Sequence, residues 1–160
     1  MEDELVLICE RLEMRQGGFS LKANLQFSAT GITALIGPSG AGKSTLLAAL
    51  AGFLEPTSGQ VLWDGSDITN MAPGLRPISV LFQDNNLFPH LTVGQNIGLA
   101  LRPNLRLNEN ENRRVLEVLE RVGLSGFENR KPAALSGGQQ SRAALARVLI
   151  SERPNVLLDD

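Results

Sequence analysis

The chain has 160 residues, of which 42% are hydrophobic and 20% are charged, a composition typical of one soluble globular domain. Its net charge of −2 gives no electrostatic reason to expect a nucleic-acid partner. No stretch approaches the ~18 consecutive apolar residues of a membrane span. Residues 1–4 are acidic where a signal peptide is basic. We therefore expect a cytosolic protein that reaches a membrane only through a partner.

The first 91 residues predict a β-rich core. Strands are expected over residues 5–9, 19–27, 32–36, 60–63 and 78–82, from apolar runs or from alternating apolar and polar side chains. Asp64-Gly65 signals a turn after the fourth strand. A helix after Lys43 is expected to close at Gly52, a suitable left-handed cap. Cys9, the lone cysteine, lies in an apolar run and is expected to be buried and inert.

Residues 92–134 predict a helical insertion into this α/β core. Thr92 is expected to cap a helix running through Leu101, and Asn108 with Glu111 has capping-box spacing for a second helix. That second helix carries an apolar stripe, which favours packing over a binding face, and it is expected to end at Gly123. Residues 135–160 then predict a helix capped by Ser136 and a short strand at 155–158. We expect one domain over 1–160, with a core at 1–91.

The strongest motif is the phosphate-binding loop G-x-x-x-x-G-K-[ST], between the predicted strand 32–36 and the helix after it. Its glycines let successive backbone N–H groups surround a polyphosphate, and the helix presents its positive end to the same anion. Lys43 is expected to reach the β- and γ-phosphates, and the Ser44 hydroxyl to reach Mg²⁺. The candidate nucleotide-binding residues are Gly37, Pro38, Ser39, Gly40, Ala41, Gly42, Lys43, Ser44 and Thr45.

A second motif follows the helical insertion. It consists of Leu135, Ser136, Gly137, Gly138 and Gln139. Two glycines directly after a capping serine allow a helix N-terminus to approach a phosphate closely. Taken alone, the pentapeptide fits either a second anion site or a tight loop-to-helix turn.

In combination, these motifs make the chain resemble the ATP-binding subunit of an ABC transporter. Residues 135–139 match that family's signature motif, Gln83 matches its Q-loop glutamine, and residues 156–159 match its Walker B strand. The resemblance implies an α/β fold: a P-loop NTPase (RecA-like) core with N-terminal antiparallel strands and an α-helical insertion. It also implies that the C-terminal part of the core is missing from this chain.

A narrower resemblance is to the ATPase subunits of bacterial thiamine importers. It rests on residues 81–88, which include the pair Asn85-Asn86, and on the run Asn96-Ile97-Gly98-Leu99. It implies ATP hydrolysis that energises an importer of thiamine or its phosphates. The implied place is the cytoplasmic face of the inner membrane. The implied partners are a permease, a second copy of the ATPase and, indirectly, a periplasmic solute-binding protein.

The resemblance also assigns roles to residues. Asp159, Ser44 and Gln83 would hold Mg²⁺, and Asp160, Gln83 and Lys43 would be catalytic. Two copies would dimerise head to tail, so that residues 135–139 of one copy face the phosphate loop of the other. ATP and Mg²⁺ are therefore the expected cofactors. Residues 84–101 are the expected docking face for the permease.

This sequence departs from the family at three places. Asp160 stands where the family usually has Glu, and its shorter carboxylate predicts slow hydrolysis with binding retained. No aromatic residue lies at positions 10–18 to stack on adenine, so Phe19 or aliphatic contacts from Leu12 or Met14 are the candidates. The chain also stops before the family's D-loop and switch histidine. We expect residues 1–160 alone to fold poorly and not to turn over ATP productively.

Three alternatives remain open from the sequence. The importer could carry another small solute, such as a polyamine or an inorganic anion. The chain could be a non-hydrolysing nucleotide-binding module, which Asp160 favours. A soluble ABC-type ATPase acting in DNA repair or translation is disfavoured by the net charge of −2 and the single cassette.

Overall fold

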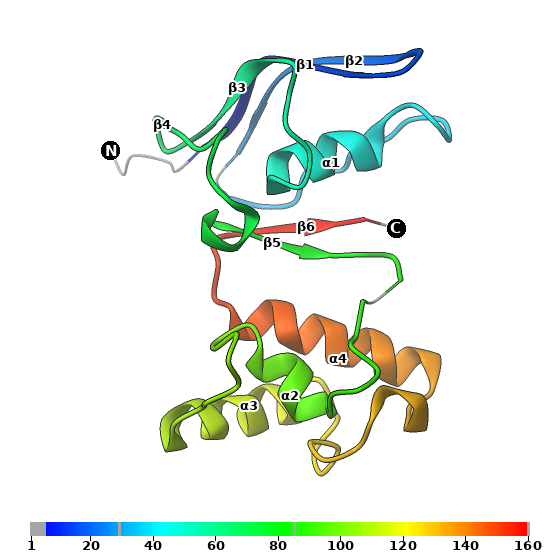
Figure 1. The fold of residues 1–160 in the computed structure, drawn as a ribbon, viewed down its shortest axis with the longest axis vertical. Coiled ribbons are helices and arrows are strands. Elements are labelled where there is room, and N and C mark those ends of the chain that lie inside the picture. Colours follow the sequence, from blue (N-terminus) through cyan, green and yellow to red (C-terminus); the bar gives the residue numbers. More distant parts are fainter. Residues whose placement is uncertain (1–5, 29, 85, 160) are drawn as a thin grey trace. The chain divides into compact units, whose positions relative to one another are not determined.

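A computed structural model describes residues 6–28, 30–84 and 86–159. The chain divides into two compact units, residues 1–78 and 79–160 (Figure 1). Among the described residues, no helix combines the length and the apolar character needed to cross a bilayer.

The first unit is built on an antiparallel sheet. Its strands are β1 (Leu7–Gln16), β2 (Phe19–Phe27), β3 (Ser58–Trp63) and β4 (Ser66–Asp67), in the order β2-β1-β3-β4. The bounds of β2 and the turn at Asp64-Gly65 confirm the predictions. Both turn residues have positive φ, 48° and 72°, as a two-residue hairpin turn requires.

The first strand is longer than predicted because it contains a bulge. Leu7 and Cys9 are buried, and after the bulge Leu12 and Met14 are buried instead, so the alternation slips by one residue. Arg11, at the bulge, has a φ of 47°. On the neighbouring strand, a Cβ at Gly59 would lie 2.1 Å from the Arg11 carbonyl oxygen, so only glycine fits there. The broken alternation explains why a period-two pattern predicted a strand that ended at Cys9.

The predicted strand over residues 32–36 is wrong. The structure assigns this segment to neither of the sheets formed by the described residues. Ile32 is 100% exposed and Ile36 91% exposed. An apolar strand of this kind depends on neighbouring strands for its hydrogen bonds and its burial, so β-propensity alone did not fix its conformation.

The helix α1 (Lys43–Ala51) follows the phosphate loop and confirms the prediction. Gly52 ends it with a φ of 88° and donates its N–H to the carbonyl of Ala49. Leu46, Ala49 and Leu50 are buried along it. The short 3₁₀ turn η1 (Pro73–Leu75) closes the first unit.

The second unit joins a two-stranded sheet to a helical core. β5 (Ile78–Leu81) pairs with β6 (Asn155–Leu158), and both strands run in the same direction (Figure 1). The helices are α2 (Val93–Gly98), α3 (Glu109–Arg121) and α4 (Gly137–Ile150), and the 3₁₀ turn η2 (Pro132–Ala134) precedes α4. The helices pack around one cluster of buried side chains that includes Ile97, Leu119, Leu124 and Ala143.

Capping residues set the starts of these helices as predicted. Thr92, Asn108 and Ser136 each accept a hydrogen bond from the third helical residue, which returns one from its side chain. The prediction that the first helix runs through Leu101 is wrong. α2 ends at Gly98, and residues 99–101 form a turn in which the Leu101 N–H bonds the Gly98 carbonyl. The predicted apolar stripe of α3 is buried in the core, as packing requires.

The Cys9 thiol is expected to be unreactive in the folded protein. Cys9 is 0% exposed, and burial raises the pKa of its thiol to about 11. Because only the thiolate is nucleophilic, iodoacetamide at pH 8 should alkylate the native protein at least ~100-fold more slowly than the urea-unfolded chain. Mass spectrometry of the two samples measures this ratio. Equal alkylation rates would mean that the thiol is not protected.

Candidate functional site

The phosphate loop is exposed and lies immediately before α1. Gly40 and Gly42 have φ values of 78° and 95°, which other residues rarely adopt. The Lys43 ammonium folds over the loop and donates to the carbonyls of Gly37, at 2.7 Å, and Pro38, at 2.9 Å. The loop therefore gathers a cation and several backbone amides at one helix N-terminus.

This arrangement fits a polyphosphate. α1 carries no acidic residue in its first turn, so the positive end of its dipole is not neutralised. The loop is tight at Gly42, where a Cβ would lie 2.8 Å from the Phe19 ring. Phe19 thus contacts the loop, whereas Leu12 and Met14 are 1% and 6% exposed. The expectation that these two aliphatic residues contact adenine is wrong, because the sheet's core already buries them.

Arg76 anchors the other end of α1, and sequence reasoning missed it. Its side chain is buried, with Nη1 donating to the carbonyls of Ala49 at 3.0 Å and Leu50 at 2.8 Å. Nε and Nη2 donate to the carbonyls of Met71 and Thr69. Burial lowers the pKa of this guanidinium, partly offset by the charge of Asp67. The last carbonyls of the helix are therefore satisfied by a cation, which also favours the negative end of the dipole.

Gly52 makes room for this anchor. A Cβ there would lie 2.5 Å from Arg76 Nε. The positive φ of Gly52 disfavours other residues independently. The helix that carries Lys43 and Ser44 is thus fixed at its far end by an arginine and a glycine that depend on each other.

The second predicted motif begins α4. The Ser136 hydroxyl accepts from the Gln139 N–H at 3.3 Å, and the Gln139 amide oxygen accepts from the Ser136 N–H at 2.9 Å. Leu135 is buried in the core, whereas Ser136, Gly137 and Gly138 are exposed. A Cβ at either glycine would meet no atom within 4 Å, so packing within this unit does not require glycine there. A ligand or a partner approaching closely would require it.

Gln83 and Asp159 lie at one edge of the small sheet. Gln83 follows β5 and Asp159 follows β6, and because the strands are parallel both residues leave the sheet at the same end (Figure 1). The Asp159 N–H donates to the Leu81 carbonyl at 3.1 Å. Lys43 and Ser44 belong to the first unit, and Gln83 and Asp159 belong to the second. Asp160 lies outside the described residues.

The donor set suits a magnesium ion bound together with phosphates. In the part of the chain that the structure describes, no group of three or more His, Cys, Asp or Glu side chains could hold a metal by itself. Magnesium usually takes one or two protein oxygens and completes its shell with water and phosphate oxygens. A hydroxyl, an amide oxygen and one carboxylate match that preference.

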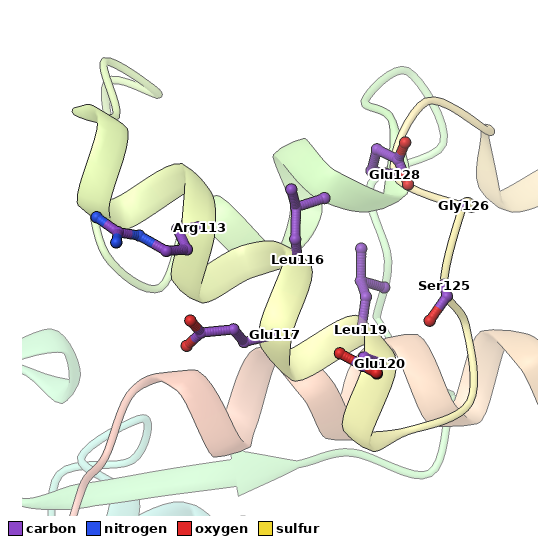
Figure 2. Close-up of a pocket in the computed structure, with 8 residues that line it drawn as sticks. All are labelled: Arg113, Leu116, Glu117, Leu119, Glu120, Ser125, Gly126 and Glu128. Atoms are coloured by element: carbon purple, nitrogen blue, oxygen red, sulfur yellow. The ribbon is translucent and has the colours of Figure 1, made fainter.

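A shallow hollow of about 220 Å³ lies on the outer side of α3, away from the predicted site residues (Figure 2). It is lined by Leu116, Leu119 and the segment from Ser125 to Glu128, together with charged side chains of α3. One carboxylate oxygen of Glu128 is buried and has no hydrogen-bond partner. None of the sequence-predicted site residues lines this hollow.

Comparison with known proteins agrees with the motifs. The ABC transporter family model matches residues 21–160. The thiamine import ATP-binding protein ThiQ of Ruegeria sp. is 57% identical over 97% of this chain and 67% of its own length. The protein of the same name from Cereibacter sphaeroides is 54% identical over the same shares. This chain therefore spans about two thirds of the length of these relatives.

Solved structures show the same fold. A nucleotide-free ATP-binding cassette from an ABC transporter has a TM-score of 0.82 at 27% identity and covers 98% of this chain and 69% of its own. A dimeric ATP-binding cassette in a post-hydrolysis state, bound to ADP and Pi, has a TM-score of 0.77 at 32% identity, over 96% of this chain and 73% of its own. These matches confirm the predicted P-loop NTPase fold. The chain therefore belongs to the ABC transporter family, as one of its ATPase cassettes.

Proposed function

We propose that this chain is the ATP-hydrolysing part of a bacterial importer of thiamine or its phosphates. The observation that carries the proposal is the shared name of relatives that are more than half identical across nearly the whole chain. The exposed phosphate loop supports the nucleotide part of it. We place the protein on the cytoplasmic face of the inner membrane, held there by a permease.

The nucleotide is ATP, bound through the loop residues 37–45. Lys43 would contact the β- and γ-phosphates, and the N–H groups of the loop would surround them. Mg²⁺ would be held by Ser44, Gln83 and Asp159, and would neutralise charge that develops on the phosphates. Positioning and charge stabilisation supply most of the catalysis in reactions of this kind.

The site is completed by a second copy of the chain. Residues 135–139 of that copy would bind the γ-phosphate, with Ser136 and Gly138 closest. The openness around Gly137 and Gly138 supports this, because nothing within their own unit needs glycine at either position. We further propose that residues 1–160 act as one domain, with core 1–91, insertion 92–134 and signature segment 135–160.

Replacing Asp160 with Glu is expected to raise the rate of ATP hydrolysis by about tenfold in the complete protein. The longer side chain would bring the carboxylate closer to the attacking water, since general-base geometry is tight. ATP affinity should stay the same. Phosphate release and an ATP titration measure the two quantities, with Asp160→Asn as the control that removes the base. A rate unchanged by Asp160→Glu would show that Asp160 is not a weak base at this position.

A non-hydrolysing nucleotide-binding module is the second candidate, and Asp160 is the observation that favours it. ATP binding without phosphate release in the complete protein would establish that function. Turnover that stops in Asp160→Asn would exclude it.

Partners and solute are tested together in the reconstituted importer. We propose that residues 84–101 dock the permease and that a periplasmic binding protein delivers the solute. ATPase activity should rise when loaded binding protein is added with thiamine. Stimulation by a polyamine or an inorganic anion, with none by thiamine, would replace the proposed solute and leave the ATPase assignment intact.

A further inference from the structure

The segment after Gln83 makes a tight turn whose carbonyl is held by α4. Asn86 has a φ of 46°, and its N–H donates to the Asp84 carbonyl at 2.6 Å. This conformation presents the Asn86 carbonyl to Arg147, whose Nη1 donates to it at 2.9 Å. A cation on the signature helix therefore binds the backbone three residues after Gln83.

α2 holds the next part of the same segment through Asn96. Asn96 is 0% exposed, and its Oδ1 accepts from the Phe88 N–H at 2.7 Å. Its Nδ2 donates to the carbonyls of Phe88 at 3.1 Å and Thr92 at 2.9 Å. Leu87 packs against the helical core. The segment from Asn86 to Leu91 is thus a fixed part of that core.

Arg147 and the signature motif lie on one rigid helix. α4 is continuous from Gly137 to Ile150, and Ser136 caps its start. Ala143, Ala146 and Ile150 are buried in the core, so the helix cannot turn on its axis without disturbing the packing. Burial lowers the pKa of the Arg147 guanidinium, which remains charged and is partly withdrawn from water. A charged hydrogen bond in such surroundings holds its acceptor strongly.

We propose that Arg147 is a positioning residue that keeps the turn after Gln83 in register with the signature motif at the start of α4. This rests on the proposed function. A shift of Gln83 on contact with ATP or Mg²⁺ reaches the Asn86 carbonyl, then Arg147, and through α4 it reaches Ser136. Arg147 touches no substrate in this account and acts only through these groups.

The test compares two substitutions at this position in the complete ATPase. Arg147→Met keeps the length and apolar stem of the side chain but removes the donors. Arg147→Lys keeps the charge and one donor. Arg121→Met is the matched control, because Arg121 is exposed on α3. For each protein, the ATP Kd, the KM, the kcat and the melting temperature are measured.

The expected result is a kcat lowered about tenfold in Arg147→Met, with Kd and KM within about twofold of wild type. Arg147→Lys should recover most of the kcat, and the control should match wild type. A wild-type kcat in Arg147→Met overturns the inference. Equal losses of affinity, rate and melting temperature in both variants overturn it too, because they indicate a purely structural role. A wild-type protein with no ATPase activity would instead refute the proposed function, and with it this inference.

Discussion

Replacing Lys43 with Ala is expected to lower ATP hydrolysis by about 10²- to 10³-fold in the complete protein. The Lys43 ammonium already lies over the loop, within hydrogen-bonding distance of the Gly37 and Pro38 carbonyls. It is therefore positioned to neutralise phosphate oxygens without rearrangement of the backbone. The rate is measured by phosphate release at saturating ATP.

Melting temperature should change little in Lys43→Ala, because the loop is exposed and its lysine supports no core contact. Lys22→Ala is the matched control, since Lys22 is an exposed lysine of the same unit whose ion pair with Glu13 lies at the surface. Hydrolysis in Lys43→Ala within twofold of wild type would contradict the assignment of the loop as the catalytic phosphate site.

Replacing Arg76 with Met is expected to lower the free energy of unfolding by about 2–4 kcal/mol. The variant would leave the carbonyls of Ala49, Leu50, Thr69 and Met71 without their donor in a buried setting. Because α1 would lose its anchor, ATP affinity should fall as well. Urea denaturation and an ATP titration of the complete protein measure the two effects.

Arg106→Met supplies the control, because Arg106 is an exposed arginine in a loop. Gly52→Ala should reproduce part of the loss, since its Cβ would displace the Arg76 guanidinium. A change below 0.5 kcal/mol in Arg76→Met, on the order of that for an ordinary surface substitution, would show that the four carbonyls find other partners.

Local signals were predicted well from the sequence. The caps at Thr92, Asn108 and Ser136, and the left-handed Gly52, each depend on residues within one turn of one another. The β2 strand was equally local, because one face is buried and its alternation is unbroken. The order of the phosphate loop, Q-loop, signature and Walker B motifs also identified the family correctly.

Features that depend on distant backbone were missed. Arg76, Asn96 and Arg147 all bind main-chain groups, and a carbonyl leaves no trace in the residue types around it. The segment 32–36 failed for a related reason, because a strand needs a partner that its own residues do not specify. Both kinds of miss arise where tertiary contacts decide between conformations that the local sequence allows.

The central claim is that the phosphate loop of one copy and residues 135–139 of another close on one ATP. Sedimentation of the complete protein, with hydrolysis blocked by Asp160→Asn, tests it most directly. ATP should convert monomer to dimer, and adding either Lys43→Ala or Ser136→Arg should abolish the conversion. An ATP-bound protein that stays monomeric, or a Ser136→Arg variant that dimerises as readily as its parent, would contradict the claim.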